Sequence, residues 1–224
     1  MKHTNNKYWR YAPLCGYGYI IVFLLGLIAS TAGNRTPGGY PTPWSNPEHI
    51  QAFYSDGHLM SALGAITQSI AGFLFVIFIV VLSDRVGRTR EDILASRLIF
   101  AGGSVTATCL FVSAVCSWLV SRPEIFLNND LLRLVQDLSF AAGGVGYALS
   151  VALLASAVLS TRFVSLWWYR MLGRFLMICG LLSVFTFVEQ GFSIFLPLAR
   201  FGSFVWIAFA AWYLFSFARQ ESER

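Results

Sequence analysis

Uninterrupted apolar runs constrain this chain more than any other feature of its sequence. Residues 73–82 read Phe-Leu-Phe-Val-Ile-Phe-Ile-Val-Val-Leu and belong to a longer apolar segment. About 20 such residues, coiled as a helix, cross the roughly 30 Å hydrocarbon core of a bilayer. Runs of this length fill most of the 224 residues, and 12% of the residues are charged, against about 25% in soluble domains. The pattern therefore excludes a soluble catalytic domain of ordinary size.

Six apolar segments can be separated, and none shows the alternating pattern of about ten residues that marks a strand of a membrane β-barrel. The sequence predicts an all-α fold. It is a polytopic transmembrane helix bundle of about six spans, with residues 1–224 forming a single transmembrane domain. The predicted spans cover about residues 13–32, 59–83, 98–120, 134–159, 171–188 and 195–217.

Basic residues are unevenly shared between the two ends of the predicted spans. Twelve of the 16 lysines and arginines precede the first span, follow the sixth, or lie near the connections between the second and third and the fourth and fifth. The other four are Arg35, Arg122, Arg133 and Arg200. Because cytoplasmic loops carry an excess of Lys and Arg, we expect the twelve and both chain termini to be cytoplasmic. The alternative is a cleavable signal peptide ending near residues 30–32, which leaves five spans.

The predicted outer loop, residues 33–57, has two halves of different character. Its first half is rich in Pro and Gly, which argues against regular structure. Its second half contains Ser45-Asn46-Pro47-Glu48, a polar cap followed by proline and an acid, as at a helix N-terminus. We expect a short helix from Pro47 to about Ser55 that leads into the second span.

Net charge and cysteines indicate neither nucleic-acid binding nor a bound metal. The formal charge of +5 comes from arginines at the ends of apolar runs, where membrane lipids explain them better than nucleic acid does. Arg170 and Arg174 share a helix face there and are predicted to contact lipid headgroups. We expect no cofactor. Four cysteines lie inside apolar runs without CxxC spacing and are assigned neither disulfides nor a metal: Cys15, Cys109, Cys116 and Cys179.

Small residues recur at helical spacing, most densely in residues 141–146, which read Ala-Ala-Gly-Gly-Val-Gly. This run is no phosphate loop, because it follows no strand, contains no lysine and lies inside an apolar segment. Small residues let membrane helices approach closely. The run is therefore predicted to pack against a neighbouring helix.

Arg200 is the charge that topology explains least. It lies about a turn and a half into the sixth span with apolar residues on both sides. An ionisable residue inside a membrane is costly, so it marks a candidate functional site whose partner must be named. One hypothesis is an outward-facing ligand pocket, near the outer leaflet, in which Arg200 pairs with Asp137 or Glu189, with His58 nearby. The other is a structural ion pair, or an arginine that snorkels outward.

Two segments carry a resemblance to a loose group of small bacterial membrane proteins of the actinobacterial type, which have about six spans. The first is Phe53-Tyr54-Ser-Asp-Gly-His58, and the second is Leu134-Val-Gln-Asp137-Leu-Ser-Phe140. The resemblance implies a six-span topology, a site in which His58 and Asp137 belong together, and the cytoplasmic membrane of a bacterium. It implies no particular activity.

The sequence contains none of the enzyme signatures HExxH, GxSxG or GxxxxGK[ST]. We expect a non-enzymatic membrane protein that binds a lipid, a small ligand, a partner membrane protein or a second copy of itself, through its outer pocket or its helix faces. A transporter or channel component is the alternative, favoured if polar residues continue through the bundle. An intramembrane enzyme is the third hypothesis.

Overall fold

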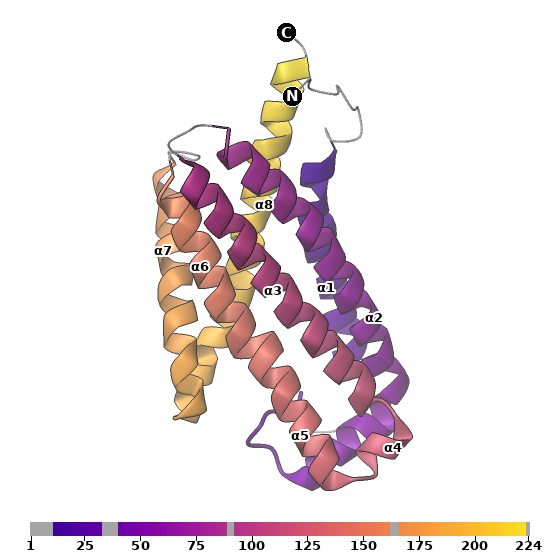
Figure 1. Ribbon diagram of the computed structural model, residues 1–224. Coiled ribbons are helices and arrows are strands. Elements are labelled where there is room, and N and C mark those ends of the chain that lie inside the picture. Colours follow the sequence, from indigo (N-terminus) through magenta and orange to yellow (C-terminus); the bar gives the residue numbers. More distant parts are fainter. Residues whose placement is uncertain (1–10, 33–39, 89–91, 162–165, 223–224) are drawn as a thin grey trace.

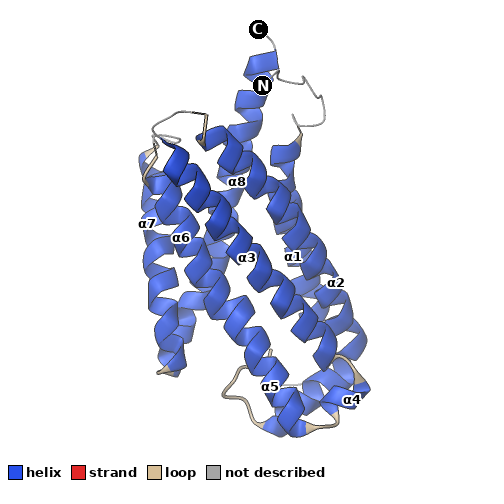
Figure 2. Ribbon diagram, in the orientation of Figure 1, coloured by secondary structure: helices blue, strands red, loops and turns tan. Residues whose placement is uncertain are grey.

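The computed structural model describes residues 11–32, 40–88, 92–161 and 166–222, and the regular elements in these ranges are all helices (Figures 1 and 2). The longer helices are α1 (Cys15–Ala32), α2 (Pro47–Val86), α3 (Ile93–Val120), α5 (Asn129–Phe140), α6 (Tyr147–Leu159), α7 (Trp167–Leu182) and α8 (Phe195–Ser222). The shorter ones are η2 (Ala12–Leu14), α4 (Pro123–Phe126), the π-helix η4 (Ala141–Gly146), η5 (Ser183–Phe187) and η6 (Gln190–Ile194).

Six helical segments of the described chain are long and apolar enough to cross a membrane. This confirms the predicted all-α class with six candidate spans. The fourth span is composite, because α5, η4 and α6 follow one another without a break, and the sixth joins η6 to α8. Each span contacts the next along the chain, and α8 returns to contact α1. The six spans therefore form a closed ring.

The helix expected from Pro47 and the second predicted span are one 40-residue helix, α2. At 1.5 Å per residue, such a helix is about 60 Å long, twice the hydrocarbon thickness. Its backbone leaves helical geometry at Gly57, where φ is −109° and ψ is 19°. The helix thus bends between the turns that precede the apolar span and the span itself.

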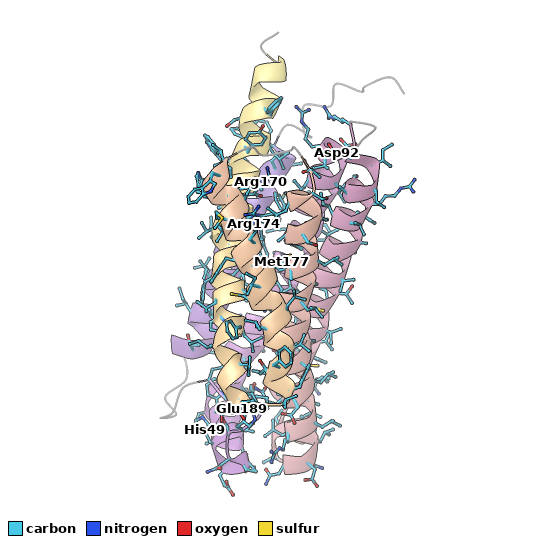
Figure 3. All side chains as sticks on the ribbon, turned by 90° about the vertical axis from the view of Figure 1, so that its left-hand side faces the viewer. His49, Asp92, Arg170, Arg174, Met177 and Glu189 are labelled. Atoms are coloured by element: carbon cyan, nitrogen blue, oxygen red, sulfur yellow. The ribbon has the colours of Figure 1, made fainter. Side chains whose placement is uncertain are left out.

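The two ends of the bundle differ in what they carry. At the end where α1 begins and α8 finishes lie the helix termini that bear Arg85, Arg88, Arg97, Arg170 and Arg174, and we call this the basic end. The opposite end, the loop end, holds α4, residues 40–46 and the start of α2 (Figure 1). Figure 3 shows Arg170 and Arg174 toward the basic end and His49 and Glu189 toward the loop end.

Apolar side chains pack the half of the ring nearer the basic end. Phe75, Phe78 and Leu82 of α2 are fully buried in one cluster with Trp206 and Ile207 of α8. Lipid tails are as apolar as these side chains, so the association of the helices depends on close packing. The polar residues of the interior gather instead toward the loop end, where they line a pocket.

Small residues set the spacing of the helices, as their recurrence predicted. A Cβ added to Gly103 of α3 would lie 2.3 Å from Cγ2 of Ile79, and one added to Gly180 of α7 would lie 2.4 Å from the carbonyl oxygen of Ala148. A side chain at Gly180 would require the backbone of α6 to move, and one at Gly103 would require the Ile79 side chain of α2 to move. The glycines therefore fix how near α2 and α3, and α6 and α7, can come.

Candidate functional site

A pocket of about 310 Å³ lies inside the ring, between the loop end and the middle of the bundle. A volume of this size falls at the lower end of the range for ligand sites. Five spans contribute to its wall, each through one helix face. The polar lining residues are Ser30 of α1, Tyr40, Tyr54, Ser61 and Gln68 of α2 and the preceding loop, Ser113 and Ser117 of α3, Gln136 and Ser139 of α5, and Arg200 of α8.

Arg200 contributes the only charge among the described residues that line this pocket. Its Nη2 donates a hydrogen bond to the carbonyl oxygen of Gly143. Its guanidinium carbon lies 3.5 Å from the centre of the Tyr147 ring and 4.8 Å from that of Phe23. Both distances fit cation–π attraction. The other terminal nitrogen, Nη1, is buried and meets no acceptor at hydrogen-bond geometry, although the guanidinium also interacts with the Tyr19 hydroxyl.

A buried hydrogen-bond network holds the Tyr147 ring in place. The Tyr147 hydroxyl lies 2.8 Å from the hydroxyl of Tyr19 and 2.7 Å from that of Ser203, and the Ser203 hydroxyl donates to the carbonyl oxygen of Arg200 at 2.7 Å. These residues come from α1, α6 and α8. The network therefore ties three spans together at the level of Arg200.

The acceptor for Arg200 comes from the π-helix η4. Its sequence, Ala-Ala-Gly-Gly-Val-Gly, is rich in glycine, which weakens regular α-helix. A π turn inside a membrane helix re-aims backbone groups, and such turns are frequent at functional sites. At Gly143 a Cβ would lie 2.3 Å from Oγ of Ser113, so only glycine lets this turn approach α3 so closely. The packing predicted for this run is present, and it serves the pocket as well.

The resemblance segments meet through residues other than those expected. The Tyr54 hydroxyl donates to Oε1 of Gln136, and Nε2 of Gln136 donates to the carbonyl oxygen of Pro41 at 3.0 Å. Gln136 is fully buried and satisfied at both ends of its amide. It therefore joins α2, α5 and the loop of residues 40–46 at the loop end of the pocket.

Asp137, Glu189 and His58 do not line this pocket. The expected ion pair is wrong: no carboxylate lies within salt-bridge distance of Arg200 among the described residues, and its guanidinium bonds to a backbone carbonyl instead. Asp137 is partly buried with an unpartnered Oδ1, whereas Glu189 and His58 are exposed.

Helix rotation explains the misplaced partner. Gln136, Ser139, Phe140 and Gly143 follow one another at helical spacing and form the face that lines the pocket. Asp137 comes one residue after Gln136, about 100° further round the helix. Depth differs as well, since Gly143 lies near the midpoint of the fourth span, so Arg200 reaches the middle of that span.

Other predicted residues lie away from the pocket. Arg170 and Arg174 are exposed near the basic end, where Arg170 approaches the carbonyl oxygen of Leu159 at 3.5 Å and Arg174 the Met171 sulfur at 3.8 Å (Figure 3). Their contact with headgroups stays a prediction. The four cysteines are free thiols. Within the described ranges, no group of three or more His, Cys, Asp or Glu side chains is placed to hold a metal ion.

Two sites outside the spans have shifted acidity. Desolvation raises the pKa of the Tyr40 hydroxyl above its ordinary value of 10.0, against weaker opposing hydrogen bonds, so this lining residue is neutral at physiological pH. At the start of α4, a backbone hydrogen bond and the neighbouring Arg122 lower the pKa of Glu124. The net charge of the pocket lining at neutral pH is thus that of Arg200.

Sequence reasoning missed Tyr147, Tyr19 and Gly143, because tyrosine and glycine are ordinary residues of membrane helices. The only available signal was spacing: Ser113 and Ser117 lie on one face of α3, which is a polar stripe in an otherwise apolar span.

No protein-family model, no curated protein and no solved structure matches this chain. The resemblance to small actinobacterial membrane proteins therefore stays a prediction.

Proposed function

We propose that this protein is a multi-pass membrane protein that binds a small anionic group in the Arg200 pocket, without catalysing a reaction. One observation carries the proposal: Arg200 places a buried, unpartnered guanidinium nitrogen at a pocket whose described lining contains no carboxylate. An arginine at the centre of a membrane helix costs about 2.5–3.5 kcal/mol on insertion scales. Cation–π contacts and one carbonyl acceptor offset part of this cost, and an anion would supply the missing countercharge.

The hydroxyl groups of the pocket suit such a ligand. Ser113, Ser117 and Ser139 lie together, with Oγ–Oγ distances of 3.2 Å from Ser113 to Ser139 and 3.5 Å from Ser117 to Ser139. Hydroxyls rotate to donate or accept, so they adapt to the oxygens of an acidic group or of a polyol attached to it. The pocket thus combines one fixed charge with several adaptable hydrogen-bond partners.

Native mass spectrometry of the gently extracted protein tests this proposal. We expect an acidic molecule bound to the wild type and absent from Arg200→Gln, which removes the charge and keeps a polar side chain. Arg133→Gln is the matched control, because Arg133 is an exposed arginine of α5 outside the pocket lining. It should retain the bound molecule. A bare wild-type protein, or the same adduct on all three proteins, contradicts the proposal.

Orientation follows from the charge distribution. The basic end carries Arg85, Arg88, Arg97, Arg170 and Arg174, so the positive-inside rule supports a cytoplasmic basic end and cytoplasmic chain termini. The pocket then faces outward, in the cytoplasmic membrane of a bacterium if the resemblance holds. A membrane-impermeant maleimide should label Thr42→Cys in intact cells. Labelling only after permeabilisation reverses this orientation.

Transport is the second candidate, and it has one observation in its favour. Arg200 bonds near the midpoint of the fourth span, and secondary transporters hold substrates near the bilayer midplane. Against it, most side chains buried in the basic half are apolar, and the buried Thr106 hydroxyl beyond Tyr147 is already bonded to Ser150 at 2.9 Å. Arg200-dependent uptake of an anion into proteoliposomes would favour transport over binding alone.

A further inference from the structure

The helices α1 and α8 meet along one side of the ring, which we call the seam. They are in contact in the half nearer the basic end, and the pocket lies along the seam in the other half. Toward the basic end the two helices touch: the rings of Phe23 and Phe204 lie 5.4 Å apart, and a Cβ on Gly16 would lie 2.9 Å from that of Ala211. Toward the loop end, Leu27 of α1 lies in the pocket wall instead, across from α8. The two helices therefore part from the level of Arg200 toward the loop end.

From the level of Arg200 toward the loop end, α1 and α8 pack against different helices. The last turns of α1 follow α2, since a Cβ on Gly64 would lie 3.2 Å from that of Ser30. The first turns of α8 follow α6 and α7, where Ala199 is buried with Ala148 and Cys179. Figure 1 shows the two helices diverging toward the loop end. Because α1 and α8 are neighbours in the closed ring, the space between them adjoins the hydrocarbon layer.

The loop of residues 40–46 crosses the aqueous side of the pocket. Gln136 bonds the carbonyl oxygen of Pro41, the Trp44 ring lies 5.7 Å from the Phe140 ring, and the Tyr40 ring lies 5.5 Å from the Phe53 ring. The loop is thus attached to both α2 and α5. The described part of the loop therefore narrows access to the pocket on the side of α2 and α5.

The pocket wall is two-sided. The helices α2, α3 and α5 contribute serine and glutamine side chains together with Phe140, whereas α1 and α8 contribute Leu27, Leu196 and Phe201 together with Ser30 and Arg200. We infer that the occupant is an anionic amphiphile of the membrane, which enters through the α1–α8 seam. Its acidic group sits at Arg200, its polar atoms lie along the serines, and its chain leaves through the seam. This inference rests on the proposed anion site and adds the class of ligand and its route.

Three probes separate the charge from the chain: dodecyl phosphate, inorganic phosphate and dodecanol. Each is titrated into the protein in phosphatidylcholine nanodiscs, with thermal unfolding and native mass spectrometry as readouts. We expect dodecyl phosphate to bind at least tenfold more tightly than either of the other two. Arg200→Gln should lose this preference over dodecanol, and Arg133→Gln should keep it.

The seam is tested with Leu27→Trp, which fills it from α1. The matched control is Leu25→Trp, because Leu25 is an exposed leucine of the same helix outside the pocket lining. We expect Leu27→Trp to weaken dodecyl phosphate binding at least tenfold and Leu25→Trp to leave it unchanged. If Leu27→Trp does not fold, Leu27→Phe provides a smaller obstruction, and we expect it to cause a smaller loss of affinity for dodecyl phosphate.

The outcomes distinguish the two proposals. Arg200-dependent binding in which inorganic phosphate equals dodecyl phosphate, or in which Leu27→Trp has no effect, overturns the amphiphile and leaves the anion site standing. Binding that is unaffected by Arg200→Gln with every probe overturns both.

Discussion

The guanidinium carbon of Arg200 lies 3.5 Å from the centre of the Tyr147 ring, so an arginine of the sixth span is held by an aromatic residue of the fourth. An ion pair would neutralise the arginine, whereas a ring attracts it and leaves its charge available. The Tyr147 hydroxyl, which is bonded to Tyr19 and Ser203, fixes that ring. The arrangement holds the guanidinium in position without neutralising its positive charge.

Two substitutions at Tyr147 separate the contribution of its ring from that of its hydroxyl. Tyr147→Phe keeps the ring beside Arg200 and removes the hydroxyl that bonds Tyr19 and Ser203. Unsatisfied buried partners cost about 1–3 kcal/mol, so we expect a lower melting temperature with anion binding retained. Tyr147→Leu removes both and should lose binding as well. Equal losses of affinity in the two variants would show that the ring does not position Arg200.

Arg200→Met should change the unfolding free energy by no more than about 1 kcal/mol without ligand. It removes a cation–π contact and a hydrogen bond, but it also removes a buried charge whose insertion costs a similar amount. Breaking a buried ion pair usually costs about 3–5 kcal/mol, because a carboxylate is stranded. Denaturation of the purified protein measures the difference, and a loss in that larger range would indicate a carboxylate partner after all.

Gly143→Ala should narrow the pocket and reduce both stability and anion binding. The added Cβ would lie 2.3 Å from Oγ and 2.8 Å from Cβ of Ser113, so η4 or α3 must move, and the carbonyl that accepts from Arg200 moves with it. Gly191→Ala is the control, since nothing lies within 4 Å of a Cβ there. Thermal unfolding and affinity measurements on both variants check this, and equal behaviour contradicts it.

Gln136→Leu should release the loop of residues 40–46 from the bundle. It removes the donor to the Pro41 carbonyl and the acceptor for the Tyr54 hydroxyl. We expect faster hydrogen exchange at the amides of Thr42, Trp44 and Ser45, and at the start of α2. Gln190→Leu, at an exposed glutamine outside the pocket, serves as the comparison. Unchanged exchange in Gln136→Leu would mean that the loop is held by its aromatic contacts.

The affinity for an alkyl sulfonate should be constant between about pH 6 and pH 8. A sulfonate stays ionised throughout, arginine stays protonated, and tyrosines ordinarily ionise near pH 10. Tyr40 has its pKa raised above 10.0, so any stability linked to it is fully present below pH 10 and is lost only as pH rises further. A change of affinity inside the tested range would show that a titratable group outside the described lining takes part in binding.

The apolar runs by themselves determined that the chain forms six helices long enough to span a membrane. Backbone groups in hydrocarbon must bond within their own segment, so runs of this length have no other regular structure available. Small residues at helical spacing likewise indicated close packing, and Gly103 and Gly143 provide it. These properties depend on local sequence alone.

Only the tertiary structure decided which residues meet at Arg200. Charge complementarity suggested Asp137 or Glu189, but the rotation and depth of each helix bring Gly143 and Tyr147 to the guanidinium instead. The same rotation turns Gln136, not Asp137, toward Tyr54. A side chain's partner depends on how helices from distant parts of the sequence pack together, and on a π turn that shifts the register within one of them. No local pattern encodes that arrangement, which is why the spans were predictable and the site was not.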